Sequence, residues 1–164
     1  MMNERQKLQH LFMFDLWCTR KLTSLIMSNS PFPQETASLA FLSHIINAQK
    51  IWFNRVVLLT EKADPDIWEE YETNEIKQEA KNSVQFWLDL IGDHEVDLNS
   101  TIYYTNSQGV SFNNTLWQIC NHLIIHGQHH RAQISLFLRN SDINPPAIDY
   151  IHFARSEFSN KNFN

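Results

Sequence analysis

LWQICNHLIIHGQHHRAQISLFLRN, residues 116–140, is the stretch that decides the fold, because its apolar residues recur with the period of an α-helix. An α-helix turns about 100° per residue, so His126 and His130 lie about 40° apart on the wheel. Both fall within the apolar stripe, which consists of Leu116, Ile119, Leu123, Ile134 and Phe137. Two imidazoles therefore occupy core positions of one long helix, where four ring nitrogens need partners.

A bound metal ion would satisfy two of these nitrogens, but a single helix face leaves the ion half open. His44 is the natural third ligand, because it borders the apolar stripe of an earlier predicted helix and can point towards a neighbouring one. Three neutral imidazoles would leave a divalent ion at least one free coordination position, which is typical of catalytic sites. Such a centre lowers the pKa of a bound water or thiol and presents an anionic nucleophile near neutral pH.

The roles of the neighbouring histidines stay open. His122 lies one turn before His126 and is interpreted as a ligand, as a partner that holds ligand geometry, or as a residue at the rim of the pocket. Spacing alone allows His122 with His126 as the ligating pair, whereas the centre of the stripe favours His126 with His130. His129 is interpreted as a rim residue.

Four other residues near these histidines have predicted roles. Gln133 lies near His126 on the wheel and is a candidate for orienting a ligand or substrate. Arg131 is on the far side of the helix, which favours a structural salt bridge. Trp52 and Tyr104 are candidate pocket walls, but ordinary core packing is the favoured interpretation of both.

Other common site chemistries lack their motifs. No histidine has a glutamate three positions earlier, as di-iron bundles require, and HExxH, GxSxG, CxxC and a phosphate-binding glycine loop are absent. Cys18 and Cys120 lie in apolar surroundings and are predicted to be buried, reduced thiols rather than a disulfide. Cys120 also faces away from His126 on the wheel, so it is a poor metal ligand.

Working outward, apolar periodicity predicts three further helices, at about residues 3–29, from residue 34 to just before residue 63, and from residue 76 to about 92–97. The fourth helix runs from a cap at residues 113–115 to about residue 140. Residues 100–112 are expected to form a short hairpin or an extended loop with a turn, and the tail a short amphipathic turn or helix. Four long helices with two long connections predict an all-α four-helix bundle, built as a single domain over residues 1–164.

Composition limits the partners. The net charge is −5 and the thirteen lysines and arginines are scattered, which argues against a nucleic-acid surface. No apolar run approaches the length of a membrane span, and the LFMFDLW stretch fails as a signal peptide because Asp15 interrupts it. We expect a cytoplasmic protein without membrane or nucleic-acid partners.

At these residues the sequence resembles the DinB and YfiT-like superfamily of bacterial metal-binding bundles. The shared motif, H-x-x-x-H-R-G-Q with a further histidine one turn before, is matched by His122, His126, His130, Arg131 and Gln133, with alanine at 132 where the motif usually has glycine. The resemblance extends through LSHIINAQKIWF with its His44, through YYTNSQGVSFNNTLWQICNH, and through NPPAIDYIHFAR. It covers most of the chain in the right order.

The resemblance implies an up-down-down-up bundle and, frequently, a homodimer. It also implies a metal ion, commonly zinc or nickel, that is bound by His44, His126 and His130. Some relatives use a low-molecular-weight thiol, such as bacillithiol or mycothiol, in S-transfer or isomerisation. Our leading hypothesis is thus a metal-dependent enzyme that activates such a thiol to attack an electrophile. The rivals are a metal-dependent hydrolase and a non-catalytic metal-binding bundle of the stress response. Metal affinity is expected to fall below about pH 6, because ligating imidazoles must be neutral.

Overall fold

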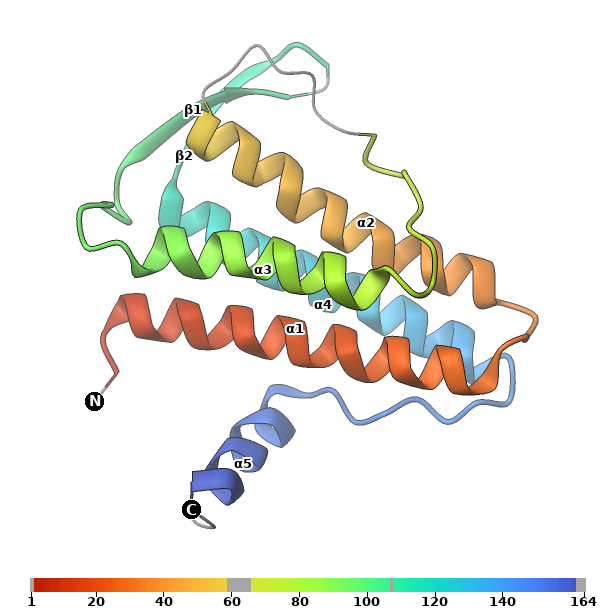
Figure 1. The fold of residues 1–164 in the computed structure, drawn as a ribbon. Coiled ribbons are helices and arrows are strands. Elements are labelled where there is room, and N and C mark those ends of the chain that lie inside the picture. The colour runs from red at the N-terminus through yellow and green to blue at the C-terminus, as the bar shows by residue number, and fades with distance from the viewer. Residues whose placement is uncertain (1, 59–65, 107, 162–164) are drawn as a thin grey trace.

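The computed structural model describes residues 2–58, 66–106 and 108–161, and four long helices dominate it (Figure 1). They are α1 (Glu4–Asn29), α2 (Glu35–Phe53), α3 (Ile76–Gly92) and α4 (Leu116–Arg139). Helices α2 and α3 run in the same direction, opposite to α1 and α4 (Figure 1). The prediction of an all-α bundle with up-down-down-up order is confirmed.

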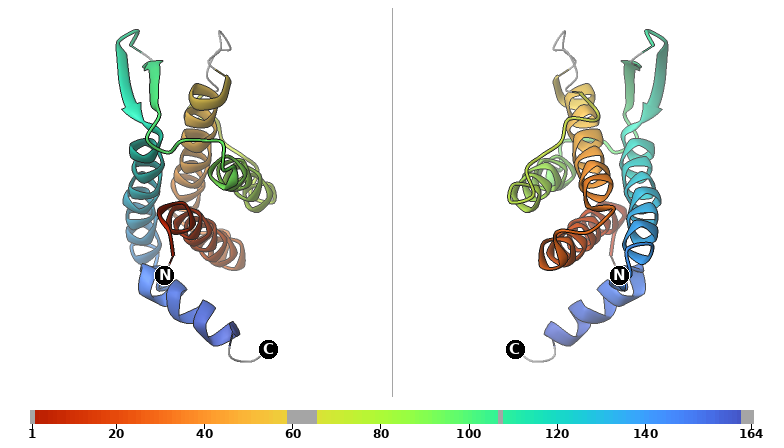
Figure 2. Two further views of the ribbon diagram at one scale, coloured as in Figure 1. Left: turned by 90° about the vertical axis from the view of Figure 1, so that its left-hand side faces the viewer. Right: turned by 90° about the vertical axis from the view of Figure 1, so that its right-hand side faces the viewer.

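Each helix of the bundle makes most of its helix–helix contacts with two others. Helix α1 contacts α3 and α4, and α2 contacts the same two helices from the opposite corner, as the end-on views show (Figure 2). Parallel neighbours such as α2 and α3 cannot be joined by a tight turn, which explains the long connection between them. The site helices α2 and α4 are therefore direct neighbours.

Apolar side chains fill the bundle in two large clusters. One surrounds Trp87, which stacks on Phe12 with ring centres 5.5 Å apart. The other gathers around Ile45 and Ile134, at the opposite end of α2 and α4. Every residue of the apolar stripe of α3 is buried: Ile76, Ala80, Val84, Trp87 and Ile91. Burial of these stripes is what brings the four helices together.

Two of the helices begin at strong caps. The Asn3 and Thr115 side chains each accept a hydrogen bond from the third backbone N–H of the helix that follows, and a glutamine at that position bonds back to the cap. Thr115 also ends a hairpin of β1 (Thr101–Thr105) and β2 (Ser111–Thr115), which are antiparallel with Tyr103 opposite Asn113. The hairpin alternative for residues 100–112 is thus the one observed.

The predicted second helix does not keep its α-helical form throughout. It changes at Phe53 into a π-helical turn, η1 (Asn54–Leu58), and the rest of the prediction, at residues 59–62, lies outside the described residues. The tail forms α5 (Tyr150–Lys161), which lies outside the four-helix arrangement (Figure 2). Its Phe153 is buried against Phe14 and Cys18 of α1, so the tail packs back on the bundle.

In the described part of the chain, none of the helices combines the length and the apolar character needed to cross a membrane.

Candidate metal centre

Three histidines from two helices converge between α2 and α4. The Nε2 atom of His126 lies 3.2 Å from Nε2 of His44 and 3.1 Å from Nε2 of His130. His126 and His130 are one turn apart on α4, and α2 brings His44 to them from the neighbouring helix. All three candidate ligand atoms lie within 4.8 Å of one another. The structure thus brings together the three residues predicted to bind metal.

The nitrogen separations fit a small divalent ion. Two imidazole nitrogens bound at about 2.0–2.1 Å and at a tetrahedral angle to each other are separated by roughly 3.3–3.4 Å. The separations of 3.1 and 3.2 Å at His126 are within a few tenths of an ångström of this value. At these two contacts, little movement would be needed for the rings to share an ion.

Hydrogen bonds at the opposite ring atoms leave Nε2 available on two of the rings. Nδ1 of His44 lies 3.3 Å from the carbonyl oxygen of Ile67, and Nδ1 of His130 lies 2.6 Å from Oε1 of Gln133. An oxygen acceptor selects the tautomer with the proton on Nδ1, so both Nε2 atoms carry lone pairs. His126 Nε2 carries at most one hydrogen and can donate it to only one of them, so at least one of the two close contacts lacks a hydrogen bond. A cation between the rings resolves this conflict.

Burial and mutual repulsion keep these imidazoles neutral. Desolvation by burial, followed by the charges of His130, His44, His122 and His129, lowers the pKa of His126 to about 3. Desolvation also lowers the pKa of His44 and of His130, although the hydrogen bond that His130 donates to Gln133 raises the pKa of His130. Neutral imidazole is the form that binds metal, so the site is prepared for an ion near neutral pH.

The neighbouring histidines lie beside the cluster rather than in it. The ring of His122 is 5.7 Å from that of His126 and 5.6 Å from that of Trp52, and His129 lies 5.2 Å from His130. Among the described residues, neither belongs to the group of nitrogens that could share an ion. The cluster therefore contains His126 and His130, the pair that the centre of the apolar stripe of α4 favoured over His122 and His126. His122 and His129 lie at the rim of the cluster.

The proposed pocket walls pack on the hairpin side of the site. Trp52 meets the Tyr104 ring edge to face at 4.7 Å, and Tyr104 donates a hydrogen bond to Asn114. Trp52 also packs against the core cluster around Trp87. Core packing therefore accounts for Trp52, as expected, while its edge contact with His122 also places it beside the histidines.

A buried polar network lies on the other face of α4. Arg131 Nη1 is 2.7 Å from Asp15 Oδ1, and both side chains are almost completely buried, at 0% and 2% exposure. The hydrogen bonds of good geometry run elsewhere, from Arg131 Nη2 to Thr19 and from Gln49 to Asp15. Ser83 then donates to Gln49, so the network joins all four helices. The predicted structural salt bridge of Arg131 is confirmed.

Gln133 orients a ring, as expected, but it contacts His130 rather than His126. Helical periodicity did not predict two other contacts, those of Ile67 and Trp68 with His44. A backbone carbonyl is present at every residue, so the contact of Ile67 leaves no mark in the sequence. The sequence does contain one indication of a docked segment, namely the polar residues Ser43 and Asn47 at buried positions of α2. Their side chains form hydrogen bonds with the backbone of Glu69 and Tyr71, close to Ile67 and Trp68.

Both cysteines are buried and free, as predicted. Desolvation by burial raises the pKa of Cys18 and of Cys120 to about 12. Neither thiol ionises near neutral pH, and neither belongs to the histidine cluster.

Comparison with known proteins places the chain in a family. The model of the DinB family matches residues 27–162, which is most of the chain and includes all three clustered histidines. No curated protein and no solved structure matches. On the strength of the family match, the chain belongs to the DinB family.

Proposed function

We propose that this protein is a metal-dependent enzyme that transfers the sulfur of a low-molecular-weight thiol to an electrophile. Zinc or nickel is the proposed ion, held by His44, His126 and His130. The observation that carries the proposal is the convergence of three Nε2 atoms, with His126 within 3.2 Å of both partners. Because the chain supplies three neutral ligands, a coordination position is left for the substrate.

When bound, a divalent ion would lower the pKa of a thiol on it and so supply thiolate at neutral pH. In the proposed reaction, the thiol proton passes to solvent and the sulfur lone pair forms a bond to an electrophilic carbon. The leaving group departs from that carbon with its electron pair. The residues of the chain hold the ligating rings, with Gln133 fixing His130 and Ile67 fixing His44.

The thiol must come from outside the chain. Cys18 and Cys120 are buried and their pKa values are raised to about 12, so they are poor nucleophiles. A small thiol would approach past the exposed His122, beside which the half-buried Trp52 and Tyr104 offer ring faces and edges. The proposed partners are therefore a thiol and an electrophile. We further propose a homodimer that works in the cytoplasm.

The first experiment measures metal content. Protein purified without an affinity tag should contain close to one equivalent of divalent metal, and His126→Ala should contain little. A His94→Ala variant is the matched control, because His94 lies outside the cluster and should leave the metal in place. Absence of stoichiometric metal from the untagged wild type would refute the metal site.

The second experiment tests the reaction. The metal-loaded protein is incubated with a panel of electrophiles, with and without bacillithiol, mycothiol or another small thiol. Thiol-dependent turnover that is lost in His126→Ala supports S-transfer. Turnover without thiol would instead indicate a hydrolase, and absence of any turnover in the metal-loaded protein would indicate a non-catalytic metal-binding bundle.

A further inference from the structure

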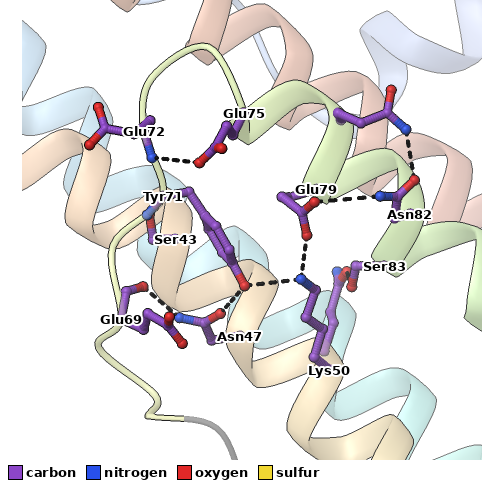
Figure 3. A network of polar contacts seen from close by, with 12 residues as sticks. Ser43, Asn47, Lys50, Glu69, Tyr71, Glu72, Glu75, Glu79, Asn82 and Ser83 are labelled. Atoms are coloured by element: carbon purple, nitrogen blue, oxygen red, sulfur yellow. Dashed lines mark hydrogen bonds and ion pairs between the residues drawn. The ribbon is translucent and has the colours of Figure 1, made fainter.

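Three polar side chains lie along one face of α2, next to the candidate metal ligand His44. Ser43, Asn47 and Lys50 are spaced by four and three residues, so they share one side of the helix. Ser43 and Asn47 are completely buried, at 0% exposure, which is unusual for such residues unless partners satisfy them. Their partners belong to residues 67–71, which we call the 67–71 segment (Figure 3).

Hydrogen bonds hold the 67–71 segment against α2 at several points. Asn47 donates to the carbonyl oxygen of Glu69 at 2.7 Å, and Ser43 accepts from the backbone N–H of Tyr71 at 3.1 Å. The Tyr71 hydroxyl donates to Asn47 Oδ1 at 2.6 Å and accepts from Lys50 at 3.0 Å. Lys50 also forms an ion pair with Glu79 of α3 (Figure 3). Burial alone would lower the pKa of Lys50, but its bonds to Glu79 and Tyr71 raise it, so its ammonium stays charged.

The same segment makes both contacts that fix the ring of His44. The Ile67 carbonyl oxygen lies 3.3 Å from Nδ1, and the Trp68 ring stacks on the imidazole with centres 4.1 Å apart and planes at 20°. Asn47 also reaches the Ile67 carbonyl, at 3.5 Å. The position of the oxygen that selects the His44 tautomer therefore depends on hydrogen bonds made by residues outside the histidine cluster.

We propose that Asn47 and Tyr71 are positioning residues for His44, and that docking of the 67–71 segment and metal binding are coupled. This inference rests on the proposed metal site. The docked segment holds the proton on Nδ1 and leaves Nε2 directed at His126. Coupling is reciprocal, so a segment that favours the ligating ring must in turn be stabilised when the ion binds. A segment with a purely structural role would change stability and leave metal affinity unaltered.

The test uses Tyr71→Phe, which removes one oxygen and with it the bonds to Asn47 and Lys50. Tyr103→Phe is the matched control, because that side chain is 71% exposed on the hairpin. Zinc dissociation constants are measured by competition with a chromophoric chelator, and cobalt spectra report the ligand geometry. Tyr71→Phe should bind zinc about 10-fold to 100-fold more weakly, as is usual when a partner of a ligating histidine is disturbed, with an altered cobalt spectrum. Asn47→Ala should behave in the same way.

Hydrogen exchange of the backbone amides in residues 68–71 supplies the second readout. Zinc should slow this exchange in the wild type and in Tyr103→Phe, and should slow it much less in Tyr71→Phe. Unchanged zinc affinity in a folded Tyr71→Phe, together with faster exchange of these amides, would overturn the positioning role and leave the metal site intact. A wild type that binds no zinc would refute the metal site itself, so the two failures are distinguishable.

Discussion

Gln133 shows how one amide orients a candidate metal ligand, His130. Its Oε1 lies 2.6 Å from Nδ1 of His130, and both residues belong to α4, three positions apart. Replacing Gln133 by alanine removes the acceptor and frees the ring to rotate or to change tautomer. We expect Gln133→Ala to bind zinc about 10-fold to 100-fold more weakly, measured by chelator competition. Gln128→Ala is the control, since Gln128 reaches towards Ile148, and equal affinities in the two variants would contradict the role of Gln133.

Gly127 carries a different kind of constraint, because it leaves room for the buried ion pair. A Cβ atom there would lie 2.7 Å from Asp15 Oδ1 and 2.8 Å from Arg131 Nη1. Alanine normally favours a helix over glycine by about 1 kcal/mol. Here we expect overpacking to dominate, so that Gly127→Ala lowers the free energy of unfolding by about 1–3 kcal/mol in urea titrations.

Ala132→Gly on the same helix is the comparison for Gly127→Ala. Ala132 is exposed, so this change should cost only the difference in helix propensity, about 1 kcal/mol. A Gly127→Ala protein more stable than the wild type would contradict this expectation. It would show that Asp15 and Arg131 can move away from the added methyl group without lowering the free energy of unfolding.

At the scale of the element, α4 depends on a cap that lies far from its ligands. Thr115 accepts from the backbone N–H of Gln118, whose side chain in turn accepts from the backbone N–H of Thr115. We expect Thr115→Ala to lower the free energy of unfolding by about 1 kcal/mol, and Thr115→Ser to keep most of the stability because it keeps the hydroxyl. Zinc affinity should be unchanged in both, because the histidines lie about three turns away. A large loss of affinity in Thr115→Ala would contradict this separation.

The elements differ in how well their sequences specify them. Helices α3 and α4 were predictable because their apolar stripes repeat over many turns, and Thr115 was one of the three cap positions predicted. The change from α-helix to π-helix at Phe53 could not be predicted, because apolar residues continue through Val56 and periodicity cannot distinguish the two forms over one turn. The His44, His126 and His130 cluster follows from helical phase, whereas the carbonyl of Ile67 depends on where a non-helical segment docks.

At the scale of the whole molecule, the four helices are joined twice, by apolar contacts and by polar ones. The network of Arg131, Asp15, Gln49 and Ser83 joins side chains of all four helices, so it helps to fix the positions of α2 and α4 relative to each other. This arrangement holds His44 close to His126. The histidine cluster is thus a property of the assembled bundle, because α2 contributes His44 and α4 contributes His126 and His130.

The burial of clustered imidazoles makes the stability of the metal-free protein depend on pH. Burial and neighbouring charges lower the pKa of His126 to about 3, against a value of 6.5 without these effects. Between these values the unfolded chain binds more protons than the folded one, so stability is complete above about pH 6.5 and falls as the pH decreases. The lowered pKa values also move the loss of metal to a lower pH than free imidazoles would give.

We therefore expect the free energy of unfolding of the metal-free protein to decrease from pH 7.5 to pH 5, and to decrease less steeply in His126→Gln. That variant lacks the titrating ring, and this range lies above the ordinary pKa values of most carboxylates. Urea titrations in the presence of a chelator measure both slopes. Zinc at saturating concentration should restore stability in the wild type and have little effect on His126→Gln, because only the complete cluster binds the folded state tightly. Identical slopes in the two proteins would show that His126 titrates as a free imidazole, and the burial of the cluster would then have no energetic consequence.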